Sequence, residues 1–133
     1  MSSLQEQKIL LLDCQTTGTS AARDRVLELG WAPFSALNAA APQVESLLLK
    51  QPEPLPKIVA GITGITPADL ENALTPQAAW EKLDHAFANF QAEAGTGQGI
   101  AVAHYAQFER PFLEKFYLEH ANGNTLPVPV LCT

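Results

Sequence analysis

The segment that most constrains the fold is a short apolar run, from Lys8 to Asp13, that ends in an acid. Its length suits a strand and is far below that of a membrane-spanning helix. A continuous apolar run of this kind is typical of a central strand that is buried on both faces of a sheet. Turn-forming residues 16–19 follow directly, so we expect this strand to end close to Asp13.

Four further segments have the length and apolar content of strands. They are Val26–Phe34, Val44–Lys50, Ile100–His104 and Val128–Thr133. Three strands therefore precede the helical part of the chain, and the predicted order of elements is βββ-α-α-β-α-β. This order predicts a single α/β domain, over residues 1–133, with a mixed five-stranded sheet flanked by helices.

Helix starts are predicted from two threonine–proline pairs. In Thr66-Pro67 the threonine can cap the helix, the proline suits its first position, and Asp69 lies near the positive end of the helix dipole. Thr75-Pro76 repeats the pair and precedes a longer helix over Gln77–Glu93. The sequence therefore predicts two helices between the third and fourth strands.

Aromatic and aliphatic residues recur at helical spacing in the longer helices. The first set is Trp80, Leu83, Phe87 and Phe90; the second, in a helix over Gln107–His120, is Phe108, Phe112 and Phe116. Such stripes indicate sides that face a core rather than cofactor sites.

Composition limits the classes of function. The chain has 133 residues, 47% of them hydrophobic, with a formal net charge of −6. That charge argues against a protein that coats nucleic acid, which needs a basic surface. It does not exclude an enzyme that meets phosphate through divalent metal, since such sites are built from carboxylates.

The N-terminus is polar and lacks the layout of a signal peptide, so we expect a cytoplasmic protein with no membrane partner. Cys14 and Cys132 are expected to be buried free thiols of a reducing compartment. There is no cysteine–histidine cluster of the kind that binds zinc.

Asp13 and Gln15 are two residues apart at the end of the first strand, so both side chains project from one face of the sheet. Oxygen ligands arranged in this way can serve Mg²⁺ or Mn²⁺, and a pair of such ions can promote cleavage of a phosphodiester. Taken alone, an acid at a strand end is a weak signal.

Four motifs raise the strength of that signal. The chain contains Asp13-Cys14-Gln15-Thr16-Thr17-Gly18, then Leu27-Glu28-Leu29-Gly30, then Gly61-Ile62-Thr63, and finally the segment from His104 to Leu113, HYAQFERPFL. In this order they resemble the D-x-E-T-T-G, I-E-I-G, G-I-T and H-N-A-x-F-D-x-x-F-L motifs of the DEDDh-type 3′–5′ exonucleases. That family includes the proofreading subunit of bacterial DNA polymerase III and ribonuclease T.

The resemblance implies a ribonuclease H-like fold and a two-metal mechanism that removes 3′-terminal nucleotides from DNA or RNA. It assigns the catalytic and metal-binding positions to Asp13, Gln15 and Glu109, and the Gly61–Thr63 segment to a loop that packs against the terminal nucleotide. The positions assigned to substrate binding are Thr16, Thr17, Gly18, Gly61, Ile62, Thr63, His104 and Phe108.

The chain departs from the family pattern at three points. Gln15 replaces a glutamate, which removes a negative charge and should weaken metal binding. Glu109 replaces an aspartate, which moves the carboxylate by on the order of 1 Å, a shift that can cost ~10²-fold in rate. The family's last motif, a histidine followed five residues later by aspartate, is expected beyond the fifth strand, so the chain corresponds to the N-terminal majority of the domain and is expected to be inactive alone.

Several candidates also have ordinary structural interpretations. A structural histidine is the alternative for His104, a core position is the alternative for Phe108, and Glu28 is expected to make structural hydrogen bonds. The arginines at 23, 25 and 110 are equally consistent with phosphate contacts and with unrelated surface charge.

Three hypotheses about function follow. The first is an impaired 3′–5′ exonuclease domain acting on the 3′ end of single-stranded DNA or RNA, within a polymerase or a larger multidomain chain. The second is a non-catalytic module of the same fold that binds nucleic acid or protein, which Gln15 favours. The third is a domain that only tethers a partner enzyme, which the acidic surface permits.

Overall fold

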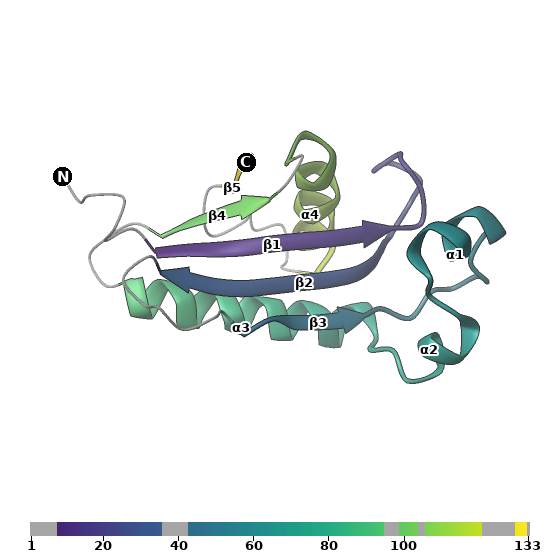
Figure 1. Ribbon diagram of the computed structural model, residues 1–133, viewed down its shortest axis with the longest axis horizontal. Helices are drawn as coiled ribbons and strands as arrows, with labels where there is room; N and C mark the ends of the chain where they lie inside the picture. Colours follow the sequence, from purple (N-terminus) through teal and green to yellow (C-terminus); the bar gives the residue numbers. More distant parts are fainter. Residues whose placement is uncertain (1–7, 36–42, 95–98, 104–105, 121–129, 133) are drawn as a thin grey trace.

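The computed structural model describes residues 8–35, 43–94, 99–103, 106–120 and 130–132. Its centre is a mixed five-stranded sheet with strand order β3-β2-β1-β4-β5 (Figure 1). The strands are β1 (Lys8–Thr16), β2 (Val26–Ser35), β3 (Glu45–Leu48), β4 (Ile100–Ala103) and β5 (Val130–Cys132). The first three form an antiparallel meander, whereas β4 pairs in parallel with β1 and β5 in parallel with β4. The predicted mixed sheet is confirmed. Of the predicted strands, His104, residues 128–129 and Thr133 lie outside the described residues.

The helices are α1 (Lys57–Thr63), α2 (Pro67–Glu71), α3 (Pro76–Ala94) and α4 (Ala106–His120). Side chains of α3 and α4 form the main core together with one face of the sheet. In α3 the predicted stripe is confirmed, since Leu83, Phe87 and Phe90 are almost fully buried and Trp80 packs against them. In α4 Phe112 and Phe116 are buried, and Phe108 is partly buried against the same core.

The two predicted helix starts are also confirmed. At α2 the Thr66 hydroxyl accepts from the Asp69 N–H at 3.2 Å while the Asp69 carboxylate accepts from the Thr66 N–H at 2.8 Å, a reciprocal capping box. At α3 the Thr75 hydroxyl accepts from the N–H of Ala78. These local interactions determine where α2 and α3 begin. The helix α1 is an additional element that the sequence pattern does not predict.

β1 is buried on one face only, within the described part of the chain. Leu10, Leu12 and Cys14 are buried beneath α3 and α4, whereas Leu11 is 38% exposed and Asp13 is exposed as well. The prediction of a strand buried on both faces is therefore wrong for these residues. The physical reason is that α3 and α4 cover the same side of the sheet.

The register places three exposed apolar side chains, Leu11, Phe34 and Leu131, on the side of the sheet that carries Asp13. We call this set the open face. None of the described helices contributes to a core cluster with these three residues.

A β-bulge interrupts the pairing of β1 and β2 near the end of β1. Gln15 pairs with Glu28 and Thr16 with Val26, so Leu27 is the additional residue of β2. Leu27 is fully buried in a second, smaller core cluster with Val59 of α1 and Ile65. The bulge thereby holds α1 at the end of the sheet toward which β1 points (Figure 1).

Both cysteines are free thiols, as predicted. Cys14 is buried in the core, but Cys132 is exposed, because β5 is an edge strand. Among the described residues, no helix combines the length and the apolar character needed to cross a membrane.

Candidate metal centre and its surroundings

Asp13 and Gln15 project from the same face of β1, opposite to the buried side chains of Leu12 and Cys14. Asp13 is exposed and Gln15 is partly buried. Both lie beyond the last residue pair of β1 with β4, which joins Leu12 to Ala103. The end of β1 therefore extends past β4 and leaves room at that edge for residues from elsewhere.

Glu109, in the first turn of α4, occupies that room. Its side chain is only 5% exposed, and its Oε1 accepts a hydrogen bond of 3.2 Å from the backbone N–H of Cys14. This N–H lies beyond the last described residue pair of β1 with β4, so the carboxylate takes the place of a strand neighbour. The strand of Asp13 and the helix of Glu109 are thus joined at the candidate site.

The carboxyl group of Glu109 lies close to that of Asp13. The pKa of Glu109 is raised to about 8, by burial first and then by the neighbouring Asp13 carboxyl, while the Cys14 N–H opposes the shift. The pKa of the Cys14 thiol is raised as well, by burial first and then by the charges of Glu109 and Asp13. The site therefore holds more negative charge than the protein around it neutralises.

The residues present fit a divalent cation. Oε2 of Glu109 and Oε1 of Gln15 are buried and have no hydrogen-bond donor in the described part of the chain. All the available donor atoms are hard carboxylate or amide oxygens, as Mg²⁺ and Mn²⁺ prefer. Within the described segments, no group of three or more His, Cys, Asp or Glu residues converges on a single point. Asp13 and Glu109 supply two carboxylates and Gln15 an amide.

Glu28 on β2 lies on the same face, directly opposite Gln15 in the register. Its pKa is raised by partial burial and then by the charge of Asp13. The structural hydrogen bonds expected of Glu28 find no partner among the described residues. The sequence alone favours a structural role for Glu28, because it does not show the strand register that brings Glu28 opposite Gln15.

Thr16, Thr17 and Gly18 begin a tight turn that leads from β1 to β2. The Thr16 hydroxyl donates to the carbonyl of Gly18 at 2.6 Å, and the Thr17 hydroxyl accepts from the N–H of Arg25 at 2.9 Å. A Cβ at Gly18 would lie 2.3 Å from Oδ2 of Asp24, which itself accepts from the N–H of Ser20. In this structure the polar atoms of the motif shape the turn beside Asp13.

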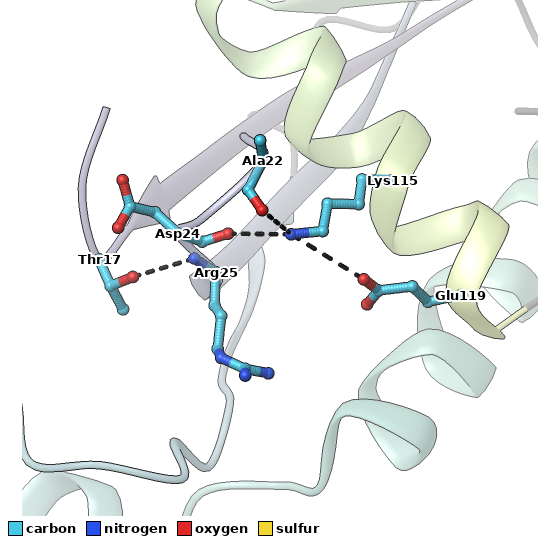
Figure 2. A network of polar contacts seen from close by, with 6 residues as sticks. All are labelled: Thr17, Ala22, Asp24, Arg25, Lys115 and Glu119. Carbon is cyan, nitrogen blue, oxygen red and sulfur yellow. Dashed lines mark hydrogen bonds and ion pairs between the residues drawn. The ribbon is translucent and has the colours of Figure 1, made fainter. Parts of the chain in front are cut away.

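Lys115 of α4 anchors the same turn from the other side (Figure 2). Its ammonium donates to the backbone carbonyls of Ala22 and Asp24 at 3.4 and 3.5 Å, and lies 4.0 Å from the carboxylate of Glu119. Figure 2 shows the Asp24 carboxylate directed away from Lys115, toward the interior of the turn. Sequence reasoning missed Lys115, because a lysine on the exposed side of a helix has no distinguishing local pattern.

Gly61, Ile62 and Thr63 form the last residues of α1, not a loop. This corrects the expectation taken from the resemblance; the local reason is that the helix continues to Gly64, whose positive φ of 74° provides the left-handed end. Ile62 is 79% exposed, while the Thr63 hydroxyl donates to the carbonyl of Val59. The exposed Ile62 side chain therefore lies at the same end of the sheet as Asp13 and Glu109, where it is accessible to solvent.

The remaining candidates differ in placement. His104 lies outside the described residues. Phe108 is partly buried, with its ring centroid 5.3 Å from that of Phe112. Arg110 donates to the backbone carbonyl of Val130 and so connects α4 with β5. A pocket of about 130 Å³ lies between the β1–β2 turn and α4 and includes Arg25, but no acid of the candidate centre lines it.

Asp13 near the end of β1 and Glu109 in the first turn of α4 are thus brought together at one edge of the mixed sheet. The model of the RNase T exonuclease family matches residues 10–117. The chain therefore belongs to this exonuclease family.

Known proteins resemble the chain in sequence and in fold. It is 31% identical over 133 residues to the PolC-type DNA polymerase III of Mycoplasma pneumoniae, a match that covers 99% of this chain and 8% of that protein. The fold matches a product-bound exonuclease I with a TM-score of 0.69 at 17% identity, over 87% of this chain and 26% of that one. Escherichia coli exonuclease I in complex with a dT13 oligonucleotide gives a TM-score of 0.67 at 18% identity, over 86% and 24%.

These matches define the fold as the ribonuclease H-like fold of the exonucleases. The chain spans less than a tenth of the length of the polymerase and about a quarter of the exonuclease I chains.

Proposed function

We propose that the chain is a 3′–5′ exonuclease-type domain whose Asp13 and Glu109 hold divalent metal against the 3′ end of a single strand of DNA or RNA. The observation that carries this proposal is the proximity of two carboxyls from different elements. That of Glu109 is 95% buried, and one of its oxygens has no hydrogen-bond donor among the described residues. Burying unneutralised carboxylates is unfavourable unless a cation or a proton joins them.

Bound Mg²⁺ or Mn²⁺ would supply an activated water and would neutralise charge on the phosphodiester as it is cleaved. Asp13 would hold metal together with Glu109, because it lies between Glu109 and the β2 side of the sheet. Gln15 offers an amide oxygen where a carboxylate would bind metal more strongly. The Cys14 N–H orients Glu109, so its carboxylate is positioned before metal arrives.

The substrate is proposed to lie over the end of β1. The turn that starts at Thr16 adjoins Asp13, and α1 presents Ile62 to solvent, where an apolar side chain can contact the terminal base. Exonuclease I, with the same fold, is known in complex with a dT13 oligonucleotide. A polymerase context is proposed from the PolC-type relative.

Metal binding is the first test. Mn²⁺ is titrated into the protein, and the free ion is measured by electron paramagnetic resonance. The unaltered chain should bind Mn²⁺, and Asp13→Asn and Glu109→Gln should each weaken this binding strongly. Glu114→Gln, an exposed acid on the same helix, serves as the matched control and should bind as the unaltered chain does. Equal affinity in all four proteins would overturn the proposed function.

A non-catalytic module of the same fold is the second candidate, and Gln15 is the observation that favours it. The substitution Gln15→Glu, made in the full-length protein, distinguishes the impaired enzyme from the non-catalytic module. If the domain is an impaired enzyme, the substitution should tighten Mn²⁺ binding and raise the rate at which a labelled strand is shortened from its 3′ end. Tighter binding without any shortening would support the module instead.

A further inference from the structure

Gln15 and Glu28 form the last regular residue pair of β1 and β2 before the bulge. Residues directly opposite one another in an antiparallel pair have Cβ atoms about 4.5–5.5 Å apart, with both side chains on one face. Glu28 therefore stands beside the amide that occupies a metal-binding position of the centre proposed above.

Glu28 is also the diagonal neighbour of Asp13, since Asp13 pairs with Gly30. Such neighbours are about 7–8 Å apart, which long side chains can span. The electrostatic influence of Asp13 on the pKa of Glu28 is consistent with this placement. Asp13 thus has one carboxylate on each side: Glu109 where β4 ends, and Glu28 on β2.

The described contacts around Glu28 leave its carboxylate available to bind a cation. Its carboxylate has neither a hydrogen-bond donor nor a cation among the described residues, and it is only partly buried. Gln15 Oε1 and Glu109 Oε2 are buried oxygens that have no donor within the described segments. Oxygens of this kind, flanking a central carboxylate, indicate two cation positions that share Asp13, rather than one point at which three acids meet.

We propose that Glu28 supplies, from the neighbouring strand, the metal-binding carboxylate that position 15 lacks. This rests on the proposed function. Ions that share a bridging carboxylate lie about 3.5–4 Å apart in two-metal sites, so two positions on either side of Asp13 would both be within its reach. The bulge at Leu27 supports the arrangement, because it ends the regular pairing immediately after Glu28.

The test compares Mn²⁺ binding by the chain and by Glu28→Gln, an isosteric change of a side chain that makes no hydrogen bond to any described residue. Glu28→Gln should lower the affinity or remove one bound ion, with a loss of about tenfold or more, since loss of outer-shell partners alone costs 10–100-fold. Glu45→Gln is the matched control: it removes the same charge from the adjoining strand β3, on the other face of the sheet, and should leave binding unchanged.

The exchange Gln15→Glu with Glu28→Gln returns the carboxylate to position 15 at constant net charge. It should restore the binding that Glu28→Gln loses, and Glu28→Asp should give an intermediate affinity. Circular dichroism and thermal unfolding confirm the fold of each variant; if Glu28→Gln is unfolded, the exchange and Glu28→Asp decide the question.

The two proposals fail in different ways. If Asp13→Asn abolishes binding while Glu28→Gln and Glu28→Asp bind as the unaltered chain does, the inference about Glu28 is wrong and the metal centre stands. If Glu28→Gln weakens binding but the exchange does not recover it, Glu28 does not replace position 15. If Asp13→Asn has no effect, the proposed function itself is wrong.

Discussion

The backbone N–H of Cys14 donates a hydrogen bond of 3.2 Å to Oε1 of Glu109, which lies 95 residues later in the chain. One bond thus joins the end of β1 to the first turn of α4, and it does so from the residue next to Asp13. The geometry of the candidate centre therefore depends on the same contact that ties α4 to the sheet.

The carboxyl pair predicts how stability depends on pH. Above about 4.5, the ordinary pKa of a glutamate, position 109 in the unfolded chain has lost its proton, whereas the folded chain keeps the proton until about pH 8. The folded state binds more protons in this range, so without metal its free energy of unfolding should fall as pH rises from 4.5 to 8. Urea unfolding between pH 4.5 and 8 measures this change in the free energy of unfolding. Glu109→Gln should flatten the dependence and Glu114→Gln should retain it; parallel curves for all three proteins would contradict the assignment.

Gly18→Ala should destabilise the turn beside Asp13. The new Cβ would meet the Asp24 carboxylate at 2.3 Å, and that carboxylate is held by the Ser20 N–H, so we expect a loss of ~1–3 kcal/mol. Gly61→Ala is the control: no atom lies within 4 Å of its added Cβ, and alanine favours a helix by up to about 1 kcal/mol. Chemical denaturation measures both. A loss at Gly18 no larger than at Gly61 would show that the turn is not constrained as described.

Lys115→Met should loosen the β1–β2 turn with little change in global stability. Its three polar contacts are long and partly exposed, so the free energy of unfolding should change by no more than ~1 kcal/mol. Trypsin cleavage after Arg23 and Arg25, followed by mass spectrometry, should nevertheless accelerate. Lys82→Met, on the exposed side of α3, should leave these cleavage rates unchanged.

Two adjacent leucines of β1 should differ sharply in their contribution to stability. Leu10 is fully buried, and Leu10→Ala is expected to cost ~2–5 kcal/mol, whereas Leu11 is 38% exposed and Leu11→Ala should cost less than about 1 kcal/mol. Thermal and urea unfolding provide the comparison. Similar losses would mean that both faces of β1 are covered.

Local interactions explain what the sequence predicts well. The capping box of Thr66 and Asp69, the Thr75 cap and the stripe of Leu83, Phe87 and Phe90 depend on residues a few positions apart, so their spacing alone is informative. The positions of Asp13 and Gln15 on one face follow from strand geometry in the same way.

Long-range geometry explains what the sequence does not predict. The exposure of Leu11 depends on which face α3 and α4 cover, and an unbroken apolar run does not distinguish the faces. The position of Glu28 opposite Gln15 depends on the β1–β2 register and its bulge. The contact of Asp13 with Glu109 requires β4 to end before β1 does; here only the resemblance of the motifs, not local pattern, indicated the pair.

The open face formed by Leu11, Phe34 and Leu131 makes the behaviour of the purified chain sensitive to temperature and to the choice of salt. Association through apolar surface weakens on cooling and strengthens in sulfate, because both conditions change the cost of hydrating that surface. Sedimentation velocity should therefore show more self-association at room temperature than in the cold, and more in sulfate than in chloride. Leu131→Ser removes exposed apolar surface from the edge strand and should reduce both differences, which makes it a practical background for the metal titrations.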